Sequence, residues 1–395
     1  MSWADKRIRV LYSFGSKLGG GRADTTAWQQ VKGLAAAGAD VLVFPGVLKW
    51  PLPLGVRVRP TLSRGKLRIP YKVLGRLRAY ALHDYIVSKR VAKLAGQIDI
   101  IHTWPLASLR TLRVAARLGI PTVYERPNAH TRLFYEVAQE ECKHLGITLP
   151  PNHEHSYSAE VVRIEDEEYQ LAGRLLCPSE YVMQTFLEKG FPPAKLARHQ
   201  YGYDEQVYYP DRQPRRVTLS LSMLFCGSCT PVKGLHYALE AWLQSPAHRD
   251  GTFLIAGQGT PEYAKRLSPM LTHPSVHVLG FRNDVPELMR RSDVLVLPSI
   301  SEGFPLVTAE ARGSGCVLLV SEAAGAVCEH RVNALVHRIG DVKTLAEHIT
   351  MLYEDRALLE RLRATSLKTV GEITWTAAGK RLLEVYHDAI VSRSP

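Results

Sequence analysis

The sequence predicts an α/β protein with two doubly wound parallel-sheet domains that face a central cleft. Three observations support this fold class. Short apolar runs of strand length alternate along the chain with segments of helical periodicity. A strand, a glycine-rich loop and a helix follow one another from residue 8, and the same order starts again near residue 219. The 395 residues are enough for two domains of ordinary size.

The first half opens with the pattern of a parallel sheet. Residues 8–14 predict a strand, the three glycines at 19–21 a loop, residues 24–37 a helix, and residues 41–44 a second strand. Right-handed crossovers connect strands in this order. The glycines lack G-x-G-x-x-G spacing, so a dinucleotide-binding fingerprint is not indicated.

Two later strands of the first half end in polar residues. Residues 98–103 and 122–125 predict strands, with a helix over 106–118 between them, and the strand ends carry His102 and Glu125. Ligands of open α/β sheets bind beyond the carboxyl ends of the strands, so we expect both side chains to face the cleft.

The segment after these strands is predicted to be exposed. Residues 153–168 read as the solvated start of a helix, because the spacing of His153 and His155 does not suit a helical metal-binding pair. Further along, residues 344–370 predict one long helix and residues 375–390 a last helix.

The second half carries a strand-to-helix loop suited to an anion. Residues 294–297 predict a strand buried on both faces, and a helical pattern starts at Leu306. Free backbone N–H groups and the helix dipole favour negative charge at such a helix start. Glu302 and Glu310 flank it with seven residues between them. Carboxylates repel phosphate, so they would accept hydrogen bonds from sugar or ribose hydroxyls, or else be two solvated acids of a plain connecting loop.

A second loop of the same kind precedes this one. Residues 219–226 predict a strand, and a loop containing Ser228, Lys233 and Gly234 leads into a helix over 235–243. A lysine at a strand-to-helix loop can reach a diphosphate, and such a charge-assisted hydrogen bond contributes roughly 1.5–3 kcal/mol.

These motifs resemble a known enzyme family. SEGFPLVTAEARGSGCVLLVSEAAGAVCE, from Ser301, is similar to the Glu-x7-Glu signature of retaining nucleotide-sugar glycosyltransferases of family four, which have the GT-B fold with two Rossmann-like domains. The segment from Gly202 to Pro210 resembles the family's G-V-D-x-x-x-F-x-P linker, and Asn333 to Val336 its N-G-L-L-V motif. The resemblance is strong over residues 205–390 and weak over 1–200.

The resemblance implies a role for each matching residue. As catalytic residues it implies Glu302 beside the donor sugar, Lys233 on the departing diphosphate, and His130 positioning donor and acceptor. Ser228 stands where the family has an arginine, which removes half of the expected phosphate clamp. The donor-binding residues implied in this way are Glu310 for the ribose, Gly20 and Gly21 for the phosphates, Ser228, Gly280, Phe281 and Arg282 for the base, and the backbone of Gly303, Phe304, Leu306 and Val307 for diphosphate and sugar. Pro305 has no N–H and donates nothing there.

The same resemblance, with the composition break at residues 210–216, predicts the domain boundaries. Residues 1–204 would form the acceptor-side domain, 205–375 the domain that binds the nucleotide sugar, and 376–395 a helix that crosses back to the first domain. No metal or other cofactor is expected, since no D-x-D motif occurs and the family is thought to use front-face attack without a dedicated nucleophile.

The charge is concentrated in the first half. Residues 1–200 hold 29 Lys+Arg against 17 Asp+Glu, whereas the remainder holds 21 of each. Between Lys49 and Lys93 there are 12 basic residues and one acid, Asp84. This excess fits a solvated face, and equally a surface for an anionic membrane leaflet or a polyanion.

Two functions therefore remain open. The first is a retaining glycosyltransferase that moves a sugar from a nucleotide-diphosphate sugar to a glycan, a glycolipid or a small-molecule alcohol. The second is a non-catalytic module that binds an anionic surface through its basic half. Nucleic acid is not an expected partner, because no aromatic platform interleaves the basic run. Scattered cysteines, the lack of a signal peptide and the lack of a long apolar run indicate a cytoplasmic protein, with the basic half favouring the inner face of the membrane.

Overall fold

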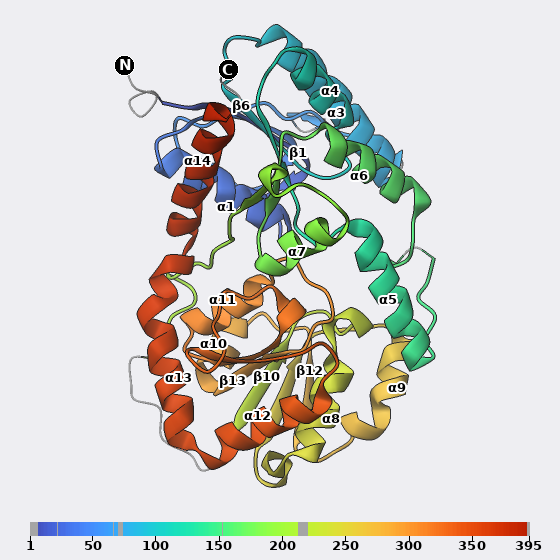
Figure 1. The fold of residues 1–395 in the computed structure, drawn as a ribbon, viewed down its shortest axis with the longest axis vertical. Helices are drawn as coiled ribbons and strands as arrows, with labels where there is room; N and C mark the ends of the chain where they lie inside the picture. The colour runs from blue at the N-terminus through green and yellow to red at the C-terminus, as the bar shows by residue number, and fades with distance from the viewer. Residues whose placement is uncertain are drawn as a thin grey trace. The chain divides into compact units, whose positions relative to one another are not determined.

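The structure is a computed structural model that describes residues 7–21, 23–65, 67–69, 74–151, 153–211 and 220–392. The chain divides into two compact units. The first comprises Met1–Pro127, Ser158–Tyr201 and Trp375–Pro395, and the second comprises Asn128–Tyr157 and Gly202–Thr374. Each unit has its own parallel sheet and its own buried apolar core (Figure 1).

The first unit is built on a parallel sheet with the strand order β3-β2-β1-β6-β7-β8-β9. Its strands are β1 (Arg9–Leu18), β2 (Asp40–Leu48), β3 (Arg57–Val58), β6 (Ile100–Thr103), β7 (Thr122–Glu125), β8 (Arg174–Cys177) and β9 (Leu196–Arg198). A separate antiparallel pair joins β4 (Ser63–Arg64) and β5 (Leu67–Arg68). The strand order reverses between β1 and β6, which is the switch point of a doubly wound sheet. Central strands such as β6 and β7 are buried along their whole length, as expected for a parallel sheet covered on both faces.

Helices cover this sheet, and one of them comes from the end of the chain. They are α1 (Ala23–Ala36), α3 (Arg76–Lys93), α4 (Leu109–Arg117), α6 (Ala159–Leu171), α7 (Glu180–Glu188), the short η2 (Pro193–Lys195) and α14 (Trp375–Val391). Helix α14 lies beside α1 (Figure 1). A Cβ on Gly379 would stand 2.6 Å from the Cα of Gly33, so the two backbones touch. Glycines at this crossing allow the close approach.

The second unit is built on a parallel sheet with the strand order β12-β11-β10-β13-β14-β15. Its strands are β10 (Ser222–Cys226), β11 (Thr252–Ala256), β12 (Val276–Gly280), β13 (Val294–Leu297), β14 (Val317–Ser321) and β15 (Ala334–His337). Its helices are α5 (Thr131–Leu145), α8 (Leu235–Gln244), α9 (Pro261–Leu271), α10 (Val285–Arg291), α11 (Leu306–Gly313), α12 (Val342–Glu354) and α13 (Arg356–Thr369), with short turns η3 (Pro231–Lys233), η4 (Pro246–Arg249), η5 (Glu322–Ala324) and η6 (Val370–Ile373). The strand order reverses between β10 and β13, so the loops after these two strands flank the switch point.

The fold class predicted from the sequence is confirmed, and two details differ. The single helix predicted over 344–370 is wrong, because the chain breaks at Asp355, whose carboxylate accepts a hydrogen bond from the N–H of Leu358 at 2.8 Å and caps α13. Residues 128–157 also leave the first unit and pack in the second, whereas the expected boundaries gave the whole of 1–204 to one domain. Among the described residues, no helix is long and apolar enough to cross a membrane.

Candidate active site

Lys233 and Glu302 meet at the carboxyl end of the second sheet. Lys233 ends the η3 turn after β10, and Glu302 lies in the loop after β13. The Lys233 ammonium donates to Oε1 of Glu302, and the Ser299 hydroxyl donates to the same oxygen at 3.2 Å. The Glu302 side chain is 9% exposed and that of Lys233 24% exposed. Two residues 69 positions apart thus form a half-buried ion pair, which no single motif of the sequence could specify.

Gly234 fixes the distance between these two loops. It has a φ of 69°, and a Cβ at this position would stand 2.1 Å from the carbonyl oxygen of Pro298. The N–H of Ile300 also donates to the carbonyl of Val232 at 2.9 Å. A side chain in place of Gly234 would force the β10 and β13 loops apart, so glycine is required for the Lys233–Glu302 pair to form.

The N-terminal end of α11 lies beside the pair. The helix begins at Leu306 after Pro305, and Gly303 and Phe304 are buried just before it. The N–H groups of Leu306 and Val307 belong to the first turn, which has no intrahelical acceptors. An anion seated there would meet these N–H groups, the positive end of the helix dipole and the ammonium of Lys233.

Glu310 lies one turn into α11 and is partly buried. Burial raises the pKa of its carboxyl to about 7, and a hydrogen bond with the Tyr208 hydroxyl acts in the opposite direction. Tyr208 belongs to the linker segment, and the Cys226 thiol at the end of β10 is a further neighbour of the carboxyl. Glu310 is therefore close to half ionised at neutral pH and can be fully ionised by hydroxyl donors.

The remaining predicted donor-binding residues of this unit lie in two loops. Ser228 is half-buried in the loop after β10 and brings no charge to it. Gly280 ends the edge strand β12 with a φ of 66°. After it, Phe281 is 71% exposed and Arg282 pairs with Asp284 at 2.8 Å. Phe281 thus offers an open aromatic face, while the Arg282 guanidinium is already held by a carboxylate.

His130 belongs to the second unit, which the sequence analysis did not foresee. It is the N-cap residue of α5, and its side chain is 3% exposed. Glu141 of the same helix accepts hydrogen bonds from the Tyr237 hydroxyl at 2.9 Å and pairs with His236 Nε2 at 2.7 Å, both on α8. These contacts tie α5 to the lysine loop, and Ala138 packs with Val232 and Ile300 beside Lys233 and Glu302.

His155 is a neighbour of Lys233 that sequence reasoning missed. The prediction of an exposed helix start over 153–168 is wrong for this residue: the helix begins at Ala159, and the His155 side chain is 12% exposed. Its ring packs edge-on against Phe134 of α5 at 5.2 Å. Burial lowers the pKa of His155 to about 4, and the charge of Lys233 acts in the same direction. The available signal was the aromatic pattern shared by 134–135 and 153–157, which suits a packed segment better than a solvated one.

Gly20 and Gly21 lie in the first unit, after β1. Both are exposed, and Gly21 has a φ of 107°. A Cβ on the preceding Gly19 would stand 2.7 Å from Cβ of Trp50, so the glycine loop is pressed against the loop after β2. The N–H of Gly21 donates to the Thr25 hydroxyl at 3.0 Å, which leaves Gly20 as the more open backbone position.

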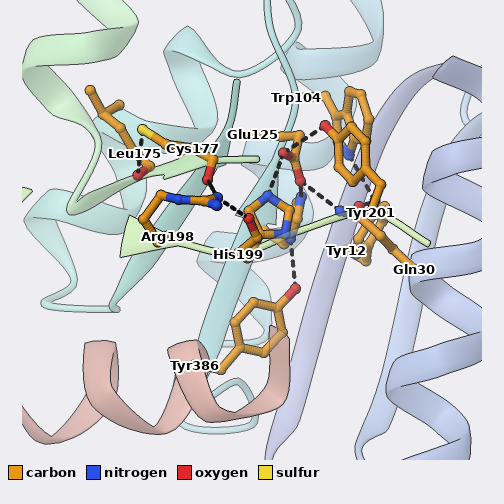
Figure 2. Close-up of polar contacts among 11 residues, drawn as sticks. Tyr12, Gln30, Trp104, Glu125, Leu175, Cys177, Arg198, His199, Tyr201 and Tyr386 are labelled. Carbon is orange, nitrogen blue, oxygen red and sulfur yellow. Dashed lines mark hydrogen bonds and ion pairs between the residues drawn. The ribbon is translucent and has the colours of Figure 1, made fainter. Parts of the chain in front are cut away.

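His102 and Glu125 do not face a cleft as the strand ends had suggested. Both are completely buried, and Figure 2 shows them in a polar network beneath α14. Glu125 accepts hydrogen bonds from Gln30 at 2.8 Å and from Tyr201 at 2.9 Å, and it pairs with His199 at 2.9 Å. Nδ1 of His102 meets the Tyr386 hydroxyl of α14 at 2.6 Å. These side chains hold the last helix on the sheet and are structural.

No metal centre is indicated within the described ranges. They contain no group of three or more His, Cys, Asp or Glu side chains arranged to hold a metal ion. The six cysteines are free thiols, five of them buried.

Comparison with known proteins agrees with this geometry. The family model of Glycosyl transferases group 1 matches residues 220–355, and that of Glycosyltransferase Family 4 matches residues 20–207. A UDP-Gal:alpha-D-GlcNAc-diphosphoundecaprenol alpha-1,3-galactosyltransferase of Escherichia coli is 24% identical over 315 residues, covering 75% of this chain and 76% of the relative. A D-inositol 3-phosphate glycosyltransferase of Thermomonospora curvata is 27% identical over 407 residues, covering 91% and 88%. The crystal structure of Anabaena HepE in complex with UDP has a TM-score of 0.65 at 18% identity and covers 97% of this chain and 100% of its own.

Two parallel-sheet units with these loops define a nucleotide-sugar glycosyltransferase of the GT-B fold. The chain belongs to the retaining glycosyltransferases of group 1, family four, as its Glu-x7-Glu resemblance implied. It is therefore an enzyme, and the alternative of a non-catalytic anion-binding module is set aside.

Proposed function

We propose that the second unit binds a UDP-linked sugar and that the enzyme transfers this sugar to a hydroxyl of a lipid-linked acceptor at an anionic membrane surface. The observation that carries the donor part is the Lys233–Glu302 pair next to the first turn of α11. Cleavage of the anomeric bond puts negative charge on the departing diphosphate. An ammonium and free helix N–H groups aimed at that charge stabilise the transition state.

In this proposal the side chains of the site divide the donor between them. Lys233 and the backbone of Gly303, Phe304, Leu306 and Val307 hold the diphosphate, with Ser228 contributing a hydroxyl. Glu302 accepts from hydroxyls of the sugar and Glu310 from those of the ribose. Phe281 stacks on the base, while Gly280 and Arg282 line it. His130 orients the sugar, and Gly20 and Gly21 approach the phosphates from the first unit.

A binding experiment tests the donor part. UDP, GDP and ADP are titrated into the full-length protein by calorimetry, with UDP expected to bind most tightly. Glu310→Ala should weaken UDP binding by at least tenfold, since a buried carboxylate that accepts from both ribose hydroxyls is lost. Glu322→Ala, an exposed acid in the same unit, is the matched control. Equal UDP affinity in both variants would refute the ribose assignment.

The acceptor part rests on the relative that uses a diphosphoundecaprenol acceptor and on the surface of the first unit. Helix α3 presents basic side chains to solvent at Arg76, Arg78, Lys89, Arg90 and Lys93. Tyr85 on the same helix is 46% exposed, with Lys89 and Arg110 over its ring. Each surface Lys or Arg contributes about 1 kcal/mol at an anionic leaflet. This face therefore has the charge and the amphipathic tyrosine of a peripheral membrane contact.

Vesicle binding tests the acceptor part. The triple variant Lys89→Ala, Arg90→Ala, Lys93→Ala should bind phosphatidylglycerol vesicles roughly a hundredfold more weakly than the wild type, at about 1 kcal/mol for each lost charge. Lys265→Ala, Arg266→Ala on the exposed side of α9 is the control. A soluble acceptor, such as the inositol phosphate named for one relative, is favoured if neither protein binds the vesicles.

A further inference from the structure

Tyr208 differs from the family pattern in a way that bears on Glu310. The linker pattern G-V-D-x-x-x-F-x-P has phenylalanine where this chain has Tyr208, so the hydroxyl is an addition of this protein. That hydroxyl is hydrogen-bonded to the Glu310 carboxylate, the group assigned to the ribose. Tyrosine and phenylalanine have the same ring shape, so packing alone gives no reason for the extra polar atom.

The linker holds the Tyr208 ring in a defined place. A tight turn precedes it: the N–H of Tyr208 donates to the carbonyl of Asp204 at 2.9 Å, and the Asp204 side chain accepts from the N–H of Gln206 at 3.0 Å. The ring of Tyr203 lies over α11, where a Cβ on Gly313 would stand 2.3 Å from it. The Tyr208 ring itself packs against the core of the second unit. Because the linker is fixed on α11, its hydroxyl stays next to Glu310.

The surroundings of Glu310 give this hydroxyl electrostatic weight. Burial is the dominant effect on the carboxyl and raises its pKa to about 7, and the Tyr208 hydrogen bond is the one interaction found to favour the ionised form. The other titratable group that faces it is the Cys226 thiol of β10, whose own pKa burial raises to about 12. A neutral thiol does not stabilise a carboxylate. At neutral pH the ionisation of Glu310 therefore depends on Tyr208.

We propose that Tyr208 is a positioning residue for nucleotide recognition: its hydroxyl orients the Glu310 carboxylate and favours the ionised form that accepts from the ribose hydroxyls. The inference rests on the proposed role of Glu310. The ribose has two hydroxyl donors, and an ionised carboxylate has two acceptor oxygens, whereas a protonated one keeps a donor of its own in the way. The linker thus sets both the strength and the pH dependence of nucleotide binding.

The test is the family-like substitution Tyr208→Phe. Calorimetry measures the Kd of UDP at pH 6.5, 7.5 and 8.5 for the full-length wild type, for Tyr208→Phe, and for Tyr209→Phe. Tyr209 is the matched control, because it is exposed and stacks with Arg290 instead of meeting Glu310. We expect Tyr208→Phe to weaken UDP binding by about tenfold at pH 7.5, the effect of one lost hydrogen bond to a charged group. The deficit should shrink at pH 8.5, where the carboxyl ionises without help, and Tyr209→Phe should match the wild type.

A second ligand separates positioning from packing. 2′,3′-Dideoxy-UDP lacks the hydroxyls that Glu310 would bind, so wild type and Tyr208→Phe should bind it equally. A wild-type Kd for UDP at every pH in Tyr208→Phe overturns the inference, and so does an equal loss for UDP and its dideoxy analogue, which would indicate a packing defect. If Glu310→Ala binds UDP as the wild type does, the proposed function itself fails, and the two failures are thereby told apart.

Discussion

Removing the Lys233 ammonium is the most direct test of the candidate site. The substitution Lys233→Ala deletes a charge-assisted hydrogen bond to the departing diphosphate, which contributes roughly 1.5–3 kcal/mol, or about one to two decades in rate. It also leaves Glu302 without its cation in a position where its side chain is 9% exposed. An uncompensated, mostly buried carboxylate next to a diphosphate repels it, so we expect kcat/KM to fall by about two decades.

A double-mutant cycle assigns this loss to its cause. Steady-state release of nucleotide from the donor sugar is measured for Lys233→Ala, for Glu302→Gln and for both together. If Lys233 acts on the diphosphate, the double variant stays as slow as Lys233→Ala. Recovery of wild-type turnover in the double variant would mean that Lys233 only neutralises Glu302. Lys343→Ala, an exposed lysine of α12, is the control, and turnover of Lys233→Ala within threefold of the wild type would refute the reasoning.

Three further outcomes follow from the geometry of the two units. Gly234→Ala should destabilise the protein by more than about 2 kcal/mol in urea unfolding, since it adds a clash 2.1 Å from a backbone oxygen to the strain of a φ of 69°. Gly340→Ala has a similar φ and only an ordinary contact at 3.6 Å, so an equal loss there would show that the clash does not matter. Tyr386→Phe leaves Nδ1 of His102 buried without its partner and should cost about 1–3 kcal/mol without changing the Kd of UDP; a melting temperature equal to the wild type would contradict this. Acid should also unfold the protein: burial lowers the pKa values of His83 and His102 to about 3 from the ordinary 6.5, so the unfolded chain takes up protons that the folded one refuses below pH 6.5. Each of the two then costs about 1.4 kcal/mol per pH unit, opposed by Glu168, whose pKa burial raises to about 7, until pH 4.5; a urea midpoint that stays constant from pH 6.5 to 3.5 would exclude this.

Local sequence determined the elements that carry the chemistry. The continuous apolar run of β13 and the helical spacing from Leu306 both appear where the pattern put them, because burial on both faces and a 3.6-residue period leave direct marks in the sequence. The Glu-x7-Glu and lysine motifs specified the enzyme family in the same way, since each lies within one strand-to-helix loop.

Residues whose place depends on long-range packing were predicted less well. His102 and Glu125 occupy the expected strand ends, yet α14, which lies more than 200 residues further along the chain, covers them. Helix α5 was not predicted to join the second unit, because its choice between two cores depends on partners such as His236 and Tyr237, about a hundred residues away. A sequence pattern records which side of a helix is apolar, but not which surface will cover it.

The amino-acid sequence by itself therefore determined that this chain forms two parallel sheets and carries a nucleotide-sugar loop with a lysine and two acids. Only the tertiary structure decided that Lys233 and Glu302 pair, that Tyr208 meets Glu310, and that His130 belongs with the second unit. The physical reason is range: helical and strand periodicity act within a few residues, whereas these contacts join segments about 70 to 100 positions apart, and depend on how whole elements pack.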